Sequence, residues 1–504
     1  MLLICFNCAI CDAALRQGAI FHVPLKQPFW SFCKQRLIFD ISRCDNIHNF
    51  AVLLFNTHVE MMKTITFIVV SFILLTANFR WNMVNSVNPE LFNNFQIDSE
   101  SLVVGRLLLS QNEGLSAHNG FLGLLHPKTD NENTNIYSWQ YSAYTNNLEY
   151  TDYEGYFTQP AGNAFLYYCL ITPFSLKGKT ALNLLYLFNS VLSALVLTAF
   201  LYWVKRLWGF HIAIAVLVAI LFSQWMTLFG RNLYWIFWAF YIPFISSLWY
   251  LEFRSGNRNI KQHEIFLVLY ISMVVKCLFN GFEYISSVLV MAMIPFVFYG
   301  IYNKWGWNLF VKRFLTGSAG ALAAVLTVMF ILTVQLSFEK GTWKDGIEYI
   351  IYSFSKRSFG EGEAYSDYIA FSLKSNLTDV LSVYFYNNIW NISHWFGETF
   401  FNLFGRVQVR IIVLGLMVVS GYWLYGLNKI KTLAGEELKR KALILTLWVS
   451  ISGPLSWIII FKGHSFIHTH MNHIVWHFPF MLFAFIVIAD FLKDIFITDN
   501  KKTV

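Results

Sequence analysis

Charged residues are scarce in this chain. Asp, Glu, Lys and Arg make up 13% of its 504 residues, whereas hydrophobic residues make up 56%. The charged fraction is about half that of an average soluble protein, which excludes a soluble globule. Apolar runs long enough to cross about 30 Å of hydrocarbon recur along the sequence. Ten are expected to span a membrane, at residues 64–80, 181–204, 211–229, 233–252, 264–280, 284–302, 315–336, 409–427, 442–461 and 474–493. The predicted fold is therefore an all-α, polytopic membrane helical bundle of about ten helices.

The short connections between these runs differ in positive charge from one side of the membrane to the other. If Lys63 is cytoplasmic, the short connections on the opposite side hold only Arg231 and Lys462. The cytoplasmic connections and tail are rich in positive residues: Lys205, Arg206, Arg254, Arg258, Lys261, Lys304, Lys312, Arg313, Lys429, Lys431, Lys439, Arg440, Lys441, Lys501 and Lys502. This asymmetry follows the positive-inside rule and predicts that both ends of the bundle are cytoplasmic. It also explains the net charge of +8 without a nucleic-acid partner.

The first sixty residues lack the long apolar runs of the rest but contain five of the seven cysteines. A C-x2-C-x2-C spacing begins at Cys5, as at the start of a bacterial ferredoxin cluster run, but Leu15 stands where the fourth cysteine would be. A zinc site would also need a fourth ligand, and no closing partner motif is found. The composition changes at Met61, where a methionine and a lysine precede an apolar helix. Residues 1–60 are therefore expected to be a disordered or misassigned extension, and residues 61–504 the transmembrane domain.

Three segments are predicted to face away from the cytoplasm. Residues 82–180 and 337–408 are too long to be turns, and the shorter loop 462–473 is rich in histidine. The two long segments contain many aromatic residues, so we expect short amphipathic helices that lie on the membrane and roof a cavity. The sequons at Asn376 and Asn391 lie on this side and are compatible with a lumenal face. No internal repeat indicates an inverted-repeat transporter.

Two carboxylates follow the first apolar helix. Asp98 and Glu100 precede an apolar stretch in the sequence "IDSESLVVG". The spacing suits a helix start, where Asp98 or Ser99 would cap the helix and Glu100 would favour its positive end. A partly desolvated carboxylate at the membrane surface can also act as a general base toward an acceptor hydroxyl or amine. Both interpretations stay open from the residues alone.

The stretches "DSESLVVGRLLLSQNEG" and, later in the same outer segment, "QPAGNAFLYYCL" resemble a known arrangement. The sequence is similar there to the GT-C class of integral-membrane glycosyltransferases, in the branch of protein O-mannosyltransferases and lipid A aminoarabinose transferases. Those proteins carry an acidic pair after the first helix, a tract ending in glycine, and a "PPL-x-Y-W-L" element. Here Ser99 separates the acids, and Ala161 and Gly162 replace the second proline and the leucine. The similarity covers residues 61–180, and the rest agrees in topology.

This resemblance implies an enzyme that takes a sugar from a polyprenyl-phosphate donor and passes it to a glycan, lipid or protein acceptor on the periplasmic or lumenal face. It implies Asp98 as the general base and inversion at the sugar. Glu100 would orient the acceptor or, as in some relatives, help Asp98 to hold a divalent metal. The membrane itself is expected to be a bacterial inner membrane, because the tail carries no endoplasmic reticulum retrieval signal, with the endoplasmic reticulum as the alternative.

A departing polyprenyl phosphate needs cationic or hydrogen-donating groups at the outer boundary of the membrane. The candidates for binding the donor phosphate there are Arg231, Lys276, Lys462, His464 and His468. Lys276 lies close to the outer end of an apolar run, and ionisable residues at that depth are functional candidates. The alternative for Lys276 is a structural pair with Glu283.

Five histidines crowd the stretch "KGHSFIHTHMNHIVWHFPF" at residues 462–480. Helical spacing would gather them roughly on two faces. Metal binding is one interpretation, although no H-E-x-x-H motif is present; phosphate or sugar binding by Lys462, His464 and His468 is the second, and packing at the membrane boundary is the third.

The function classes that compete with a transferase are a polysaccharide polymerase or ligase and a transporter of lipid-linked sugars. A transporter would need ionisable residues close to the bilayer midplane and broken helices. The predicted spans are almost free of charge, and the polar residues concentrate in the outer segments. The carboxylates after the first helix favour the transferase over the polymerase.

Overall fold

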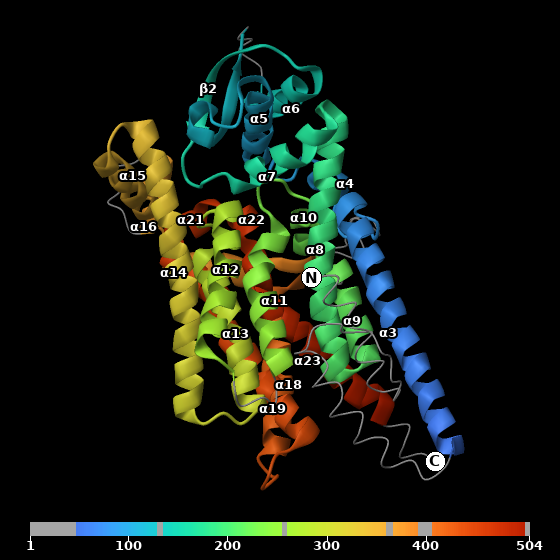
Figure 1. Ribbon diagram of the computed structural model, residues 1–504. Helices are drawn as coiled ribbons and strands as arrows, with labels where there is room; N and C mark the ends of the chain where they lie inside the picture. The colour runs from blue at the N-terminus through green and yellow to red at the C-terminus, as the bar shows by residue number, and fades with distance from the viewer. Residues whose placement is uncertain (1–46, 129–134, 255–259, 359–365, 392–405, 499–504) are drawn as a thin grey trace.

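The computed structural model describes residues 47–128, 135–254, 260–358, 366–391 and 406–498. Within these ranges the chain is mostly helical. Figure 1 shows long helices side by side in a bundle, with the shorter elements of residues 82–180 gathered over one end. The all-α membrane bundle is confirmed in this coarse sense. The predicted extension 1–60 lies largely outside the described ranges, and α3 runs from Ile47 through Met61 to Trp81.

The long elements of the bundle form in the order in which the apolar runs occur. Their bounds are α3 Ile47–Trp81, α8 Gly178–Trp208, α9 Phe210–Leu221, α10 Gln224–Phe229, α11 Phe237–Arg254, α12 Gln262–Asn280, α13 Ile285–Tyr302, α14 Trp307–Lys340, α18 Val409–Leu427, α19 Gly435–Ser450, α20 Ser452–Ile460 and α23 Phe480–Thr498. In the described part of the chain, seven helices are long and apolar enough to cross a membrane, or eight if a pair bent by 55° (Thr469–His477 and Phe480–Phe496) is one span.

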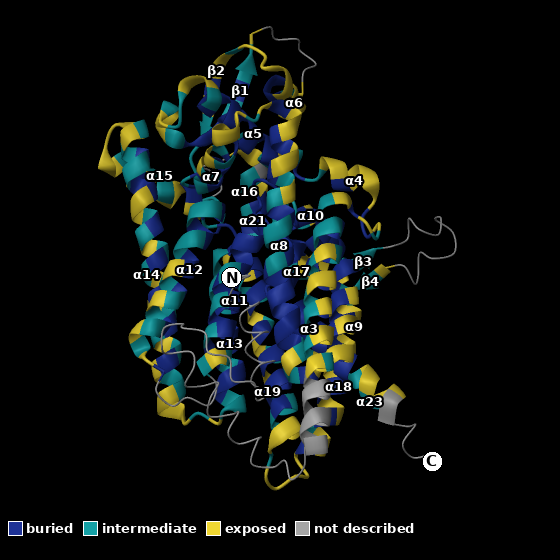
Figure 2. Cartoon of the chain, turned by 45° about the vertical axis from the view of Figure 1, so that its right-hand side comes forward, coloured by how far each residue is buried: buried dark blue, intermediate teal, exposed yellow. Residues whose placement is uncertain are grey.

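The other two predicted spans form helices that fall short of these criteria. The run 211–229 breaks after α9, because Ser223 accepts a hydrogen bond from the backbone N–H of Met226 and starts α10. The helix α9 is then only about 18 Å long. The run 233–252 forms α11, about 27 Å long, which is rich in aromatic residues and contains Pro243. Most residues of α11 are buried, whereas exposed residues run along α3 (Figure 2). A helix enclosed by protein does not need the hydropathy of a lipid-facing one.

The first outer segment forms a small layer above the bundle. Its elements are α4 Pro89–Asn94, α5 Ile97–Glu113, η1 Ala117–Gly120, β1 Leu122–Pro127, α6 Ile136–Asn146, β2 Tyr150–Tyr156, α7 Gly162–Ile171 and η2 Thr172–Phe174. The expectation of helices alone missed the antiparallel pair β1–β2, in which Gly123 lies opposite Gly155. A Cβ at Gly123 would lie 2.2 Å from the carbonyl oxygen of Glu154, so the close approach of the strands requires glycine there. The Gln140 side chain holds α6 to β1 by pairing with both backbone groups of Leu125.

The second outer segment and the histidine-rich loop lie at the same end of the bundle. The second segment contains α15 Trp343–Ser355, α16 Asp367–Lys374, α17 Leu377–Tyr386, β3 Asn388–Asn391 and β4 Arg406–Gln408. The loop folds as α21 Lys462–Ile467, α22 Thr469–Asn472 and η5 His473–His477. On α15, the exposed side chains of Trp343, Ile347 and Ile351 follow one another at four-residue spacing, so this helix is amphipathic.

The top of α14 connects these segments. Asn119 in η1 donates to Glu339 at 2.7 Å, and Gln335 donates to the Asn119 carbonyl oxygen at 2.8 Å. The helix α14 has 34 residues, more than a bilayer needs, and therefore reaches past the bundle into the layer above it. Both large outer segments are thereby fixed over one end of the helices.

Candidate functional site

A pocket of about 280 Å³ lies where the outer layer meets the bundle. Its walls come from segments far apart in the sequence: the start of α5, the end of β2, the connection before α11, the turn between α12 and α13, and the loop from α21 to α22. The lining residues are Gln96, Asp98, Ser99, Leu102, Leu124, Tyr137, Glu154, Gly155, Tyr156, Tyr234, Trp235, Glu283, His464, His468 and Met471. The fold thus brings Asp98, His464 and His468 together.

Asp98 is exposed in the first turn of α5. Within the described ranges, no hydrogen bond reaches its carboxylate, and its negative charge raises the pKa of His468 across the pocket. The helix starts here without a side-chain cap, because Gln96 precedes it in a left-handed conformation with φ of 55°. The capping role expected for Asp98 or Ser99 is therefore not what holds this helix end. Asp98 is left accessible to a ligand in the pocket.

Glu100 has a different environment, although it is only two positions away. Two helix positions point about 200° apart, so Glu100 turns into the protein and is buried. Its carboxylate accepts hydrogen bonds from the Tyr141 hydroxyl at 2.8 Å, from the Leu233 backbone N–H at 2.9 Å and from the Tyr186 hydroxyl. Burial raises the pKa of Glu100 above its ordinary value, although the hydrogen bonds from Tyr186 and Leu233 lower it.

These two carboxylates do not fit a shared metal ion. They point in different directions, and both oxygens of Glu100 already accept hydrogen bonds from protein groups. Across the part of the chain that the structure describes, no group of three or more His, Cys, Asp or Glu side chains is arranged to hold a metal. The role of Glu100 that the geometry supports is to tie α5 to α6, α8 and the connection before α11.

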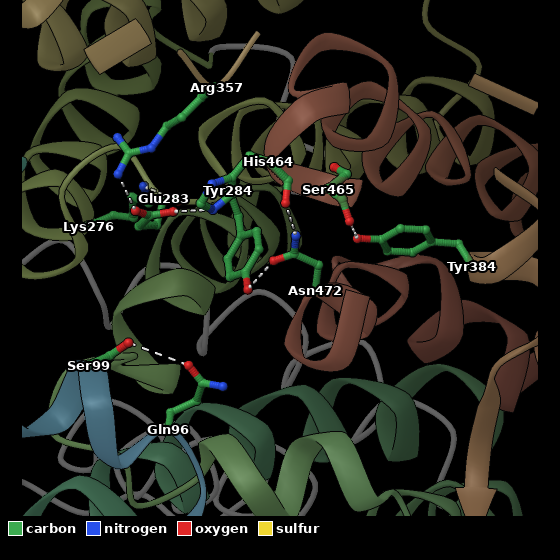
Figure 3. Close-up of polar contacts among 10 residues, drawn as sticks. All are labelled: Gln96, Ser99, Lys276, Glu283, Tyr284, Arg357, Tyr384, His464, Ser465 and Asn472. Carbon is green, nitrogen blue, oxygen red and sulfur yellow. Dashed lines mark hydrogen bonds and ion pairs between the residues drawn. The ribbon is translucent and has the colours of Figure 1, made fainter. Parts of the chain in front are cut away.

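On the opposite side of the pocket, Glu283 lies between a cation and a histidine (Figure 3). Arg357 Nη2 lies 3.4 Å from Glu283 Oε1, and His464 Nε2 lies 3.8 Å from Glu283 Oε2. The backbone N–H of His464 also donates to the Arg357 carbonyl oxygen at 3.3 Å. Arg357 is mostly buried, and desolvation is the largest influence on its pKa, which it lowers. The charge of Glu283, together with Tyr156, Tyr234 and Tyr349, raises the pKa by more than this, so the net pKa is raised and Arg357 stays protonated.

Lys276 stabilises the turn that carries Glu283. Its ammonium donates to the backbone carbonyls of Gly281 at 2.8 Å and Glu283 at 2.7 Å. The predicted pairing of Lys276 with Glu283 therefore exists, but through the backbone of Glu283 and not through its carboxylate. Lys276 is fully buried and does not line the pocket.

The other two cationic residues predicted to bind phosphate, Arg231 and Lys462, also donate to backbone carbonyls and do not line the pocket. Arg231 donates to the Phe92 carbonyl oxygen at 2.9 Å and stacks on the Phe92 ring at 4.0 Å. Lys462 donates to the Leu373 carbonyl oxygen at 2.8 Å. Sequence reasoning overlooked Arg357, the cation next to the pocket. The signal for it was the pair of adjacent positive residues Lys356 and Arg357 in a predicted outer segment.

Four of the five histidines fall into two groups. His464 and His468 line the pocket with ring centroids 4.4 Å apart. Burial, together with the charges of His470 and Arg357, lowers the pKa of His468 to about 4. Burial, together with the charges of His468 and Arg357, lowers the pKa of His464 well below its ordinary value. Both imidazoles are therefore neutral at pH 7.

Of the histidines that follow, His473 and His477 pack inside the protein, whereas His470 is exposed. The ring of His473 is stacked between Trp225 and Tyr384, with centroids 5.3 and 4.6 Å away. His477 pairs with the Ser223 hydroxyl at 2.9 Å. The packing interpretation of the histidine cluster therefore describes these two, while the binding interpretation concerns His464 and His468.

The segment that carried part of the family resemblance has an unusual backbone. Ala161 has φ of 60°, a conformation that proline cannot adopt because its ring fixes φ at about −65°. A Cβ at Gly162 would lie 2.6 Å from the Leu278 carbonyl oxygen. The second proline and the leucine of the family element are thus excluded here by local geometry.

A scan against models of protein families, a search of curated proteins and a search of solved structures each gave no match to this chain.

Proposed function

We propose that this protein is an integral-membrane glycosyltransferase of the GT-C class. It would transfer a sugar from a polyprenyl-phosphate donor to a glycan, lipid or protein acceptor, with inversion at the sugar. The observation that carries the proposal is the position of Asp98, an exposed carboxylate facing a pocket whose far wall holds Glu283, His464 and His468. The pocket lies at one end of a bundle with seven or eight candidate spans in its described part, where a lipid-borne donor can reach it.

The chemistry assigned to Asp98 is general-base catalysis. Its carboxylate would take the proton of the acceptor hydroxyl or amine while the acceptor atom attacks the anomeric carbon of the sugar. The bond between that carbon and the phosphate oxygen breaks in the same step, and the polyprenyl phosphate leaves. Arg357 is the cation next to the pocket and can approach the leaving phosphate only if part of its attraction to Glu283 is given up. Glu100 serves the fold in this proposal, and no step requires a metal.

The membrane topology belongs to the same proposal. We place α9 with α10 and α11 in the bilayer beside the eight spans, which gives ten crossings and both ends of the bundle in the cytoplasm. The pocket then faces the periplasm of a bacterial inner membrane or, as the alternative, the lumen of the endoplasmic reticulum. The distribution of positive residues over the connections supports this orientation.

The test is a radiolabel transfer assay in membranes with a panel of polyprenyl-phosphate sugars. Asp98→Asn should lower transfer by about 10²- to 10⁴-fold, the usual contribution of a general base. Asp152→Asn is the matched control, because Asp152 is an exposed carboxylate of the same outer segment that does not line the pocket. Full activity of Asp98→Asn would remove Asp98 from the chemistry.

The products separate the competing functions. Long glycan chains in place of singly glycosylated acceptor would identify a polysaccharide polymerase or ligase. If wild type and Asp98→Asn were equally inert while proteoliposomes moved lipid-linked sugar between leaflets, the protein would be a transporter.

A further inference from the structure

Three polar atoms in the pocket wall are buried without a hydrogen-bond partner among the described residues. They are Glu283 Oε2, His464 Nε2 and Trp235 Nε1. The three residues are 7%, 9% and 3% exposed, and all of them line the pocket. They come from three separate segments: the connection before α11, the turn after α12, and α21. Most buried polar atoms in proteins are paired, and each unpaired one costs about 1–3 kcal/mol. Glu283 Oε2 and His464 Nε2 face each other at 3.8 Å, which is too far for a hydrogen bond. A ligand in the pocket that reaches these three atoms would supply the missing partners.

The three side chains are held in place by other contacts. Arg357 engages the second oxygen of Glu283, and Lys276 fixes the backbone of the same residue. The backbone N–H of Trp235 donates to Asn232 Oδ1 at 2.7 Å. The ring of His464 packs between Trp457 and His468. These groups can therefore receive a ligand with little further loss of conformational entropy.

Their chemistry favours hydroxyl groups over phosphate. A sugar hydroxyl donates one hydrogen bond and accepts others, so it can donate to Glu283 Oε2 and accept from the indole N–H of Trp235, while the neutral imidazole of His464 can do either. A phosphate only accepts, and the carboxylate of Glu283 would repel it. The rings of Tyr234 and Tyr156, with centroids 6.3 Å apart, add apolar surface beside these groups.

We propose that Glu283, His464 and Trp235 form a hydroxyl-binding subsite that recognises the sugar, and that the donor phosphate binds outside this subsite. This inference rests on the proposed function, because it takes a lipid-linked sugar as the ligand. Of the phosphate-binding and sugar-binding roles that the sequence left open for His464, it selects sugar recognition.

The test compares two probes on the full-length protein in lipid nanodiscs: polyprenyl-phosphate hexoses, and polyprenyl phosphate without a sugar. The dissociation constant of the bare polyprenyl phosphate divided by that of the hexose-bearing lipid measures the contribution of the sugar. Trp235→Phe keeps an aromatic ring, although a smaller one, and removes the indole N–H, and it should lower this ratio about fivefold, as expected for one neutral hydrogen bond. Glu283→Gln should lower it about 10- to 100-fold, because a charged acceptor is lost. Binding of polyprenyl phosphate alone should change less than about twofold in Trp235→Phe. In Glu283→Gln it should not weaken, because that variant removes a carboxylate that repels the phosphate and attracts Arg357.

Trp249→Phe is the matched control. Trp249 is buried and its indole N–H also has no partner among the described residues, but it does not line the pocket. This variant should leave the ratio unchanged. A second readout uses deoxy sugars: removal of the hydroxyl that Trp235 binds should weaken binding to wild type and cost nothing further in Trp235→Phe. That loss of coupling would not follow from a structural role of the ring.

Two results would overturn the subsite. In the first, Trp235→Phe or Glu283→Gln weakens polyprenyl phosphate as much as the sugar-bearing lipid. In the second, no hexose improves binding to wild type over the bare carrier. The sugar contribution to binding could depend on Trp235 and Glu283 while no donor gives transfer in the radiolabel assay. That result would support the subsite and contradict only the transferase proposal.

Discussion

Removing the carboxylate of Glu100 should weaken the fold before it affects any chemistry. In wild type this buried group accepts hydrogen bonds from Tyr141, Tyr186 and the backbone of Leu233. Hydrogen bonds to charged groups contribute about 1.5–3 kcal/mol each. The contributions of neighbours are not additive, and the lost burial of a charge offsets part of them, so we expect Glu100→Ala to lower the free energy of unfolding by about 3 kcal/mol. For a chain of 504 residues this corresponds to a fall of roughly 3 °C in the unfolding midpoint.

The assay is thermal unfolding of the purified protein in detergent, followed by tryptophan fluorescence. Glu100→Gln keeps the shape and one acceptor oxygen and should lose about half as much stability as Glu100→Ala. Glu113→Gln is the control, because Glu113 is an exposed carboxylate on the same helix that accepts a hydrogen bond from the Tyr150 hydroxyl. It should change stability by less than about 0.5 kcal/mol. Glu100→Gln with wild-type stability and no transfer activity would refute this reasoning and return Glu100 to the catalytic role that the family resemblance implies.

Three further predictions follow from single contacts. The pKa of His468 is lowered to about 4, so below pH 6.5 the unfolded chain binds a proton at this residue and the folded chain does not. The free energy of unfolding should therefore fall as the pH is lowered from about 6.5 to 4. Thermal melts of His468→Gln should show a shallower fall over the same range. Gly123→Ala should lower the melting midpoint by several degrees, since its Cβ would lie 2.2 Å from a carbonyl oxygen of β2; an unchanged midpoint would mean that the strands can separate freely. Arg357→Gln leaves Glu283 without its cation and should cost about 3 kcal/mol or more in thermal melts, whereas Arg357→Lys should recover part of that loss.

The helices were predictable because long apolar runs determine them almost alone. Their breaks were harder to predict. Nothing in the hydropathy of residues 211–229 marks Phe222 as a helix end, since the break depends on the Ser223 cap and on a hydrogen bond between Ser223 and His477, far along the chain. The strands β1 and β2 were missed for a related reason: their pairing joins segments that the sequence separates by α6, and the paired glycines carry no periodic signal.

The candidate site shows the same division between local and long-range information. Asp98 and the histidines drew attention by residue type, and the predicted topology placed them on one side of the membrane. Asp98 and Glu100 point in different directions because this stretch is a helix; in an extended loop they would point to the same side. The sequence left the capping role and the catalytic role of these carboxylates open. Arg357 was overlooked because its partner Glu283 is distant in sequence, and only the tertiary fold brings the second outer segment over the turn after α12.

The pocket contains two carboxylates in different surroundings. Asp98 is open to the pocket and receives no hydrogen bond within the described part of the chain, so it can move toward an acceptor group and take its proton. Glu283 is buried, and its attraction to Arg357 holds it in place. A mobile carboxylate such as Asp98 suits proton transfer, and a fixed carboxylate such as Glu283 suits recognition of a hydroxyl group. Proton transfer and selection of the sugar are therefore assigned to opposite walls of the pocket. A variant of Asp98 should lower the transfer rate and leave sugar binding unchanged, and a variant of Glu283 should weaken sugar binding and leave proton transfer unchanged.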